Sequence, residues 1–450
     1  MEKPSRTLGA LSAGLGLSVL LGGGALLAAP PSVLVITVDT LRADRLSGYG
    51  YARATSPGID RLMSAGARFL EARTNEPLTA PALATMWTAL APHEHGASRN
   101  GLRMSPELPS LGKVLSLRGF RTAAFVGNWT LRDRLLGLGE HFDSYNEVFT
   151  RKRWFGLIKA EATASDLNDA ALTWLAGHVD REPELPFLIW LHYVEPHAPY
   201  RLQEEFRERL GLPAGPELPP SDRYDTEVAF VDQAIGELLD GVESLVPDVD
   251  LLTVFTADHG ESLGEHDYWG HGRNLHEPGL RVPLSITWHG RIEPGSIAGP
   301  ALLIDLPRTI LGLIELPVPA TFGGIDWSSV LTDGADPPRD RVTFYQAHKG
   351  AVQPTEVPEK ARRRGLIQVA RLAGGVKEIY RTGKRQRLEF DLYEDPLELG
   401  SRIEPTSDPS SELTAWLELV RQGLDESDAL APAQLDDETI EQLRALGYID

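Results

Sequence analysis

Short runs of consecutive apolar residues alternate along the chain with segments in which apolar residues recur every three or four positions. The short runs are rich in branched side chains, so each predicts a buried strand. The predicted strands cover residues 32–38, 120–126, 186–193, 251–256 and 283–288. Helical spacing is found over residues 56–66, 81–90 and 222–239. This alternation favours a parallel α/β sheet with helices on both faces.

The pattern changes after about residue 335. Residues 365–380 are typical of a hairpin around a Gly-Gly turn, and residues 388–392 are expected to pair with it. Helical segments follow at 412–422 and 437–446. We therefore expect an N-terminal segment over 1–30, a main α/β domain over 31–335 and a smaller C-terminal α+β subdomain over 336–450.

The N-terminus begins with Lys3 and Arg6, and residues 7–29 then carry no charge. This pattern predicts either a secretory signal, cut after Ala25, or an uncleaved membrane anchor. A buried hydrophobic hairpin is the remaining alternative. The positive-inside rule would leave the rest of the chain outside the cytoplasm, in the periplasm or the extracellular space. Contact with a membrane is expected only through this segment.

The amino-acid composition limits the classes of partner and the kinds of chemistry expected for this chain. Of 450 residues, 44 are Lys or Arg and 64 are Asp or Glu, which gives a formal charge of -20. A nucleic-acid partner is not expected, because binding to phosphates needs a basic surface. The absence of cysteine excludes disulfides, thiolate metal sites and a cysteine nucleophile.

Polar residues gather at or just after the ends of the predicted strands. They are Asp39, His192, Glu195, His197, Asp258 and His259. Open α/β sheets place their active sites at this edge. Thr79 lies just ahead of a predicted helix, where backbone N–H groups favour an anion.

Asp39, Thr79, Asp258 and His259 together offer two carboxylates, a hydroxyl and an imidazole. This mixed set suits Zn²⁺ or Mn²⁺ better than Ca²⁺, and a metal on the Thr79 hydroxyl would create a nucleophile near neutral pH. Each residue alone also has a structural interpretation, the aspartates as helix caps and the Thr-Ala-Pro sequence as a turn.

Longer motifs occur in a fixed order along the chain. They are VLVITVDTLRADRLSGYG, LTAPALATMWTALAPHEHG, LHYVEPHAPY, FTADHGESLGEHDYWGHGRNLHEPGLRVPL, DLYEDPLE and IEQLRALGYID. From about residue 33 to 319, and again at the C-terminus, the chain resembles the sulfatase branch of the alkaline phosphatase superfamily. The resemblance implies an alkaline-phosphatase-like three-layer sandwich with a central, mostly parallel sheet.

The chain departs from that family at its nucleophile. The family's sulfatases oxidise a cysteine or serine to formylglycine, with Pro two residues on and Arg four residues on, whereas this chain has Thr79, Pro81 and Leu83. Threonine cannot become formylglycine by that route. Four further family positions also differ: the second Asp is Thr40, the Gly-Lys-Trp-His element is Gly127-Asn128-Trp129-Thr130, the late Lys is His271, and the Asp-Asn pair is Asp258-His259.

These departures resemble the superfamily's threonine-nucleophile members, which act on phosphate esters, phosphodiesters or phosphonates. By that resemblance, Asp39, Thr79, Asp258 and His259 would bind the principal divalent metal, and Asn128 would donate to a phosphoryl oxygen. The resemblance gives His197 and His271 three alternative roles: binding a non-bridging oxygen, protonating the leaving group or holding a second metal. Further candidates for that second metal are Glu195 and His192.

Several neighbouring residues also have structural interpretations. His197 could cap a turn. His93, His95 and His266 are expected to be loop residues. Arg281 is expected to form a structural ion pair, with a substrate clamp as the alternative.

The favoured function is metal-dependent hydrolysis of a phosphate mono- or diester through a phospho-threonine on Thr79. Three alternatives remain open. The chain could hydrolyse sulfate esters without formylglycine, or transfer a phospho-headgroup from lipid to glycan. It could also be a pseudoenzyme that binds a sulfated or phosphorylated glycan without turnover.

Overall fold

The computed structural model describes residues 30–153, 158–215, 217–352, 365–403 and 408–426. Its centre is an eight-stranded sheet in the order β12-β2-β11-β8-β1-β7-β3-β4. These strands are β1 (Ser32–Val38), β2 (Ala67–Phe69), β3 (Arg121–Val126), β4 (Ser144–Glu147), β7 (Phe187–Tyr193), β8 (Leu251–Ala257), β11 (Leu284–Trp288) and β12 (Gly295–Ile297). Two small antiparallel pairs lie outside it, formed by β5 (Arg151–Arg153) with β6 (Ile158–Glu161) and by β9 (Ser262–Leu263) with β10 (Trp269–Gly270).

The central strands run parallel. β1 pairs in parallel with both β7 and β8, and β3 pairs in parallel with β7 and β4. β11 is antiparallel to β8 and β2, so the mostly parallel sheet contains one reversed strand. In the registers of β1, Val38 lies opposite Tyr193 on β7 and Ala257 on β8. The carboxyl ends of the three strands are therefore level at one edge of the sheet.

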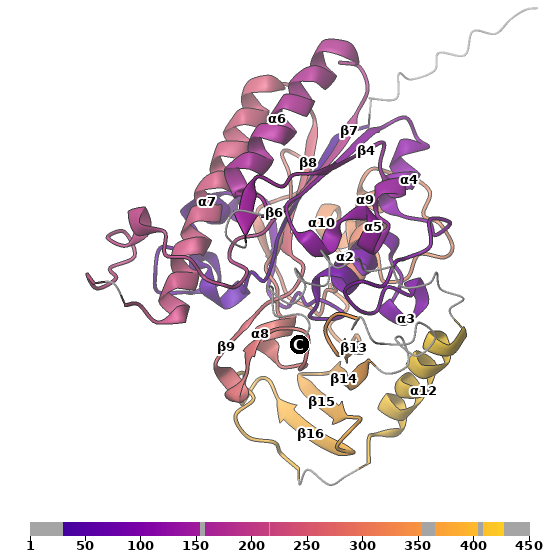
Figure 1. Ribbon diagram of the computed structural model, residues 1–450. Helices are drawn as coiled ribbons and strands as arrows, with labels where there is room; N and C mark the ends of the chain where they lie inside the picture. The colour runs from indigo at the N-terminus through magenta and orange to yellow at the C-terminus, as the bar shows by residue number, and fades with distance from the viewer. Residues whose placement is uncertain (1–29, 154–157, 216, 353–364, 404–407, 427–450) are drawn as a thin grey trace, which may run out of the picture.

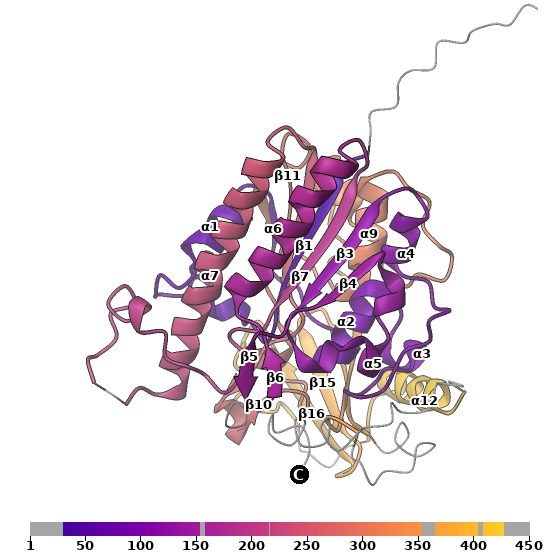
Figure 2. The ribbon, with the colours of Figure 1, turned by 45° about the horizontal axis from the view of Figure 1, so that its top comes forward.

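Helices cover both faces of this sheet, which confirms the predicted three-layer fold. α6 (Ala164–Arg181) and α7 (Pro220–Leu245) lie together on one side, and α2 (Thr79–Thr88), α4 (Leu111–Ser116) and α9 (Leu306–Leu313) lie on the other (Figures 1 and 2). The other α-helices of the main body are α1 (Pro57–Ser64), α3 (Pro92–His95), α5 (Asp133–Leu136), α8 (Glu277–Leu280) and α10 (Ser328–Thr332). α7 extends beyond the predicted range 222–239 at both ends. At its N-terminal end, Pro220 can occupy the first turn because an N–H donor is not needed there.

A second, antiparallel sheet lies beside the edge of the main body where α8 is found (Figure 1). It contains β13 (Thr343–His348), β14 (Leu366–Ala373), β15 (Val376–Arg381) and β16 (Gln386–Asp391) in sequential order. The predicted hairpin is present, and Gly374 and Gly375 form its turn at φ 55° and 80°, as a two-residue turn of this type requires. α12 (Ser411–Glu426) packs on β14 and contributes Leu413 and Leu417 to a small core.

Two sequence predictions lie outside the described residues. They are the apolar N-terminal segment, with its signal, anchor and hairpin alternatives, and the helix expected at 437–446. Among the helices that the structure does describe, none combines the length and apolar character needed to cross a bilayer.

Candidate active site

Four neighbouring strands of the main sheet end at the candidate site. Asp39 follows β1, Asp258 and His259 follow β8, and Asn128 follows the turn after β3. Glu195 and His197 lie in the loop after β7 and are buried. Because the strand order here is β8-β1-β7-β3, the fold brings all of these residues to one edge.

Thr79 opens helix α2, all of whose residues are buried. The next residue, Ala80, donates its backbone N–H to the side-chain oxygen of Asn100 at 3.1 Å. That bond fixes the amide orientation of Asn100, and its buried Nδ2 has no hydrogen-bond partner among the described residues. Asn100 therefore holds the first turn of α2 and leaves an unused donor beside it. Sequence reasoning missed Asn100, because no local pattern places it against this helix.

The predicted metal ligands converge. Asp39, Asp258 and His259 are each fully buried and each offers one ligand atom, all within 4.8 Å of one another. The Nε2 atom of His259 lies 3.3 Å from Asp258 Oδ2 and 3.9 Å from Asp39 Oδ1. The hydroxyl of Thr79 lies 3.3 Å from the same Nε2 atom. One small volume thus holds all four donor groups.

The hydrogen bonds of His259 fix which ring nitrogen faces this volume. Its Nδ1 atom lies 2.9 Å from the carbonyl oxygen of Gly260, which can only accept, so Nδ1 carries the proton. Nε2 then presents a lone pair to the carboxylates and to Thr79. Burial and the neighbouring His271 lower the pKa of His259 well below its usual range, which keeps the imidazole neutral and able to ligate a metal.

The two carboxylates repel each other in this buried position. Burial and the charge of Asp39 raise the pKa of Asp258 well above its usual range. Burial would also raise the pKa of Asp39, but His197 and His192 outweigh it and hold that pKa low. Asp39 Oδ1 and Asp258 Oδ2 have no hydrogen-bond partner among the described residues. Buried, unpaired carboxylate oxygens are costly unless a cation neutralises them, so this donor set fits a divalent metal.

Two further histidines line the same site. The ring of His271 lies with its centroid 4.6 Å from that of His259 and 5.1 Å from that of His197. Its Nδ1 atom is 2.9 Å from a carboxylate oxygen of Glu261. Burial lowers the pKa of His271, but the charge of Glu261 outweighs burial and raises it above the usual value. Sequence reasoning missed Glu261, although it stands two residues after His259 in the DHGE motif.

Asn128 forms a hydrogen bond with Asp39 in this structure. Its Nδ2 atom donates to Asp39 Oδ2, and its Oδ1 atom accepts from the N–H and hydroxyl of Thr130, both at 2.8 Å. The side chain therefore orients the carboxylate of Asp39, which is one of the predicted metal ligands. His192 lies on the other side of Asp39, with its Nε2 atom 3.7 Å from Oδ2 and its Nδ1 atom 2.9 Å from the hydroxyl of Thr37.

Other histidines serve packing. His93 and His95 belong to α3 and are buried, in contrast to the loop expected for them. His93 bonds Gln346 at 3.0 Å and His95 bonds Thr85 at 3.1 Å.

A second group of possible metal ligands contains His266, His276 and Glu398. The planes of its two rings differ by 13° with centroids 3.8 Å apart, so their in-plane lone pairs do not converge on one point. Glu398 is also 2.9 Å from Lys377. We assign this group to an ionic network rather than to a metal site.

A family model described as Sulfatase matches residues 31–316. Human arylsulfatase A is 26% identical over 392 residues, covering 75% of this chain and 75% of the relative. A solved structure in complex with its substrate, D-glucosamine-2-N,6-O-disulfate, aligns with a TM-score of 0.68 at 18% identity, covering 90% of this chain and 100% of that one. The phosphonate monoester hydrolase of Agrobacterium radiobacter aligns with a TM-score of 0.64 at 18% identity, covering 92% and 95%.

Proposed function

The chain belongs to the sulfatase family and is an ester hydrolase, and we propose that it cleaves phosphate esters with Thr79 as the nucleophile. The observation that carries the proposal is the position of the Thr79 hydroxyl, 3.3 Å from His259 Nε2 and next to two buried carboxylates. A threonine in this place cannot supply the aldehyde hydrate of formylglycine. It can supply an alkoxide, which attacks phosphorus directly.

Asp39, Asp258, His259 and Thr79 would hold the divalent metal in this proposal. A donor set of carboxylates, imidazole and hydroxyl favours Zn²⁺ or Mn²⁺ over Ca²⁺. When bound, the ion supplies positive charge that lowers the pKa of the Thr79 hydroxyl and neutralises an ester oxygen. Asp39 Oδ1 and Asp258 Oδ2, which have no hydrogen-bond partner among the described residues, support the binding of one such ion. His192 and Glu195 stay candidates for a second.

In the first step, Thr79 loses its proton to solvent and its oxygen forms a bond to phosphorus. The bond from phosphorus to the leaving oxygen breaks on the opposite side, and its electron pair stays on that oxygen. His271 donates its proton to the leaving oxygen, which departs as an alcohol. The raised pKa of His271 suits this role, because it favours the imidazolium form that can donate the proton.

In the second step, water attacks the phospho-threonine. The neutral imidazole of His271 accepts a proton from that water, and the bond between phosphorus and the Thr79 oxygen breaks. A proton from solvent restores the hydroxyl. Glu261 acts as a positioning residue throughout, since its carboxylate accepts from His271 Nδ1 and thereby directs Nε2 toward the reacting group.

Sulfate-ester hydrolysis is the second candidate function. Its support is that relatives such as human arylsulfatase A carry that activity in their names, and that a structural neighbour was solved with a disulfated glucosamine. The phosphonate monoester hydrolase neighbour supports phosphorus instead. The organic part of the substrate would be a glycan or a lipid headgroup. Transfer of a phospho-headgroup at the membrane and binding without turnover stay alternatives, as does export to the periplasm or extracellular space.

The test compares four substrates in parallel: p-nitrophenyl phosphate, bis-p-nitrophenyl phosphate, a phenylphosphonate ester and p-nitrophenyl sulfate. Each is assayed with Zn²⁺ and with Mn²⁺, for the native chain and for Thr79→Ala. We expect metal-dependent cleavage of a phosphorus ester that falls at least about 10³-fold in the variant. Cleavage of the sulfate alone would replace the proposal by its second candidate. No turnover despite bound metal would contradict both.

A further inference from the structure

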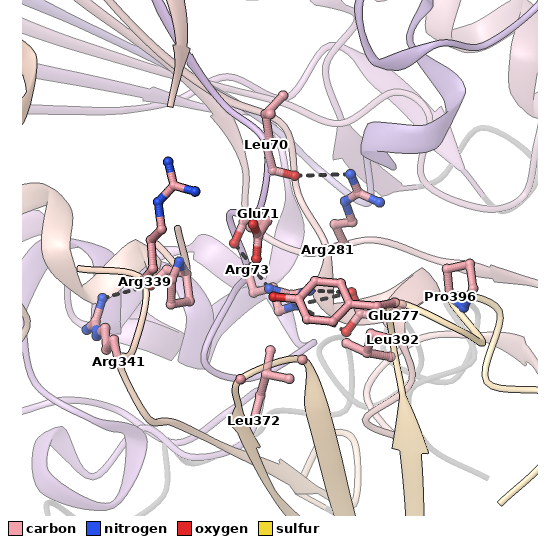
Figure 3. Close-up of a pocket in the computed structure, with 14 residues that line it drawn as sticks. Leu70, Glu71, Arg73, Glu277, Arg281, Arg339, Arg341, Leu372, Leu392 and Pro396 are labelled. Carbon is pink, nitrogen blue, oxygen red and sulfur yellow. Dashed lines mark hydrogen bonds and ion pairs between the residues drawn. The ribbon is translucent and has the colours of Figure 1, made fainter. Parts of the chain in front are cut away.

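A cavity of about 240 Å³ opens where the edge of the main sheet meets the C-terminal sheet (Figure 3). Its walls come from the segment after β2, from α8, from the segment before β13 and from the β14–β15 turn. It shares no residue with the candidate active site. α8 contributes Glu277 to the cavity and also contacts the active-site segment, because the N–H of Gly260, next to His259, donates to the carbonyl of Gly279 in that helix at 2.9 Å.

The charged lining of this cavity is unusual for so acidic a chain. Four arginines and two glutamates face it, although the whole chain carries a formal charge of -20. These residues are Arg73, Arg281, Arg339, Arg341, Glu71 and Glu277. A cluster with excess positive charge in a negative molecule focuses an attractive potential for anions.

Two of the arginines are neutralised within the protein. Arg73 is buried and forms an ion pair with Glu277 at 2.9 Å. Arg341 bonds the buried carboxylate of Asp305, with Nη2 2.8 Å from Oδ1. Both arginines are thereby neutralised and leave little charge for a ligand.

The other two arginines form no ion pair with a carboxylate among the described residues, although the charge of Arg281 helps to lower the pKa of Asp44 and Glu71 lies in the same lining. Arg281 donates to the carbonyl of Leu70 at 3.0 Å, and its buried Nε has no hydrogen-bond partner among the described residues. The ion pair expected for Arg281 from the sequence is absent from the interactions of the described residues. Arg339 is exposed, and no ion pair joins it to a described carboxylate. Arg281 and Arg339 stand on opposite sides of the Arg73–Glu277 pair (Figure 3).

An aromatic ring completes the cavity. Tyr393 lines it and is 74% exposed. The ring lies so close to Gly375 that a Cβ atom there would collide with it, and Gly375 also has a positive φ of 80°. Glycine at this turn therefore makes room for the ring. An exposed aromatic face beside unpaired guanidinium groups suits an organic molecule that carries an anionic group.

We propose that this cavity is a second anion site, in which Arg281 and Arg339 bind a tetrahedral oxyanion, sulfate or phosphate. Planar guanidinium groups bind such oxyanions through paired N–H donors, and Arg281 and Arg339 each bring one such group to the lining. The anion has two sources, free inorganic product or an esterified group on a larger molecule. Tyr393 contacts only the second. The site is independent of turnover at Thr79.

Calorimetric titration of the full chain tests the proposal with three probes: inorganic sulfate, inorganic phosphate and phenylphosphonate, whose carbon–phosphorus bond resists ester hydrolysis. The native chain is compared with Arg339→Gln and with Arg281→Gln/Arg339→Gln. Arg118→Gln is the matched control, because Arg118 is exposed in the loop before β3. We expect one class of sites to weaken at least about tenfold in both Arg339 variants and to stay unchanged in the control.

Arg339 is exposed, so its single variant keeps the test valid even if substitution of Arg281 disturbs folding. If phenylphosphonate binds more tightly than phosphate, and if this difference in affinity is lost in Tyr393→Ala, the site is assigned to an esterified anion. Equal binding of both assigns it to free inorganic anion. Unchanged affinity and stoichiometry in both arginine variants would overturn the proposal. Because the readout is binding, this result is separate from the presence or absence of turnover.

Discussion

At the scale of single residues, the candidate site is defined by groups that have no hydrogen-bond partner among the residues that the structure describes. Asp39 Oδ1 and Asp258 Oδ2 are two such buried oxygens, and the Nε2 lone pair of His259 faces them. Such groups are costly in a folded protein and persist where a ligand uses them. The same reasoning singles out Asn100, whose buried Nδ2 is unused beside Thr79.

His271→Ala tests the role of the general acid. We expect kcat/KM for an alkyl phosphate, whose leaving alcohol needs a proton, to fall by about 10²- to 10⁴-fold. The value for p-nitrophenyl phosphate, whose leaving group departs as an anion, should fall by less than about tenfold, because kcat/KM reports the steps up to departure of the leaving group and not the second step, in which His271 acts as a base. Steady-state kinetics on both substrates measures the difference. Equal losses on the two substrates would contradict a proton-donating role.

Asn100→Ala tests the support of the nucleophile. The variant removes the acceptor for the Ala80 N–H, so unfolding in urea should show a loss of about 0.5–2 kcal/mol, as for other helix caps. Asn100→Asp keeps an acceptor but replaces the Nδ2 donor with a buried, unpaired carboxylate oxygen, so it should not recover this stability at neutral pH. If kcat of the folded Asn100→Ala variant equals that of the native chain, the unused Nδ2 donor has no part in the reaction.

At the scale of elements, the sequence predicted the central strands and the polar residues that follow them, because buried apolar runs and strand-end carboxylates are local signals. The direction of β11 could not be predicted, since a buried run reads the same whether it is parallel or antiparallel. The contact of Asn100 with α2 and the bond from Asn128 to Asp39 were also beyond prediction, because segments far apart in the chain form them.

The contact between α1 and α7 gives a pH-dependent prediction. Asp232 of α7 accepts the N–H of Ile59 at 2.7 Å, and burial raises its pKa to about 6. The carboxyl group of Asp232 therefore binds a proton more tightly in the folded state than in the unfolded state. The stability due to this protonation is fully present below pH 4 and is lost as the pH rises through 6.

Asp232→Asn keeps an acceptor for Ile59 but removes the charge. Relative to the native chain, its free energy of unfolding should rise between pH 4 and pH 7.5 by up to about 3 kcal/mol. Urea unfolding at several pH values measures this gain, with Asp240→Asn, an exposed position on the same helix, as the control. A difference that does not change with pH would contradict the prediction.

At the scale of the whole molecule, a buried ionic network joins the main body to the C-terminal sheet. Lys377 of β15 lies 2.9 Å from Glu277 of α8 and 2.9 Å from Glu398. Glu277 also pairs with Arg73. Burial lowers the pKa of Lys377, but the two carboxylates outweigh it and raise that pKa, so the lysine stays charged. No sequence pattern predicted this network, because its members lie in separate elements.

Lys377→Met should be strongly destabilising, since it leaves the buried carboxylate of Glu398 without its cationic lysine partner, with His276 and the N–H of Glu277 as its other described partners. We expect a loss of about 3–5 kcal/mol in the free energy of unfolding, measured in urea. Arg402→Met is the control, because the ion pair of Arg402 with Asp391 is exposed and should contribute less than about 1 kcal/mol. Equal, small effects in the two variants would show that the network does not hold the two sheets together.

The covalent intermediate on Thr79 is the central claim of this account. The direct measurement mixes metal-loaded protein with a large excess of bis-p-nitrophenyl phosphate, quenches the reaction in acid within the first turnovers and maps the peptides by mass spectrometry. The account predicts a p-nitrophenylphosphoryl group on Thr79, since the diester loses one p-nitrophenol on attack and keeps the other, and this adduct is absent from Thr79→Ala. Rapid turnover of a phosphate ester with Thr79 unmodified, or retained activity in Thr79→Ala, would contradict it.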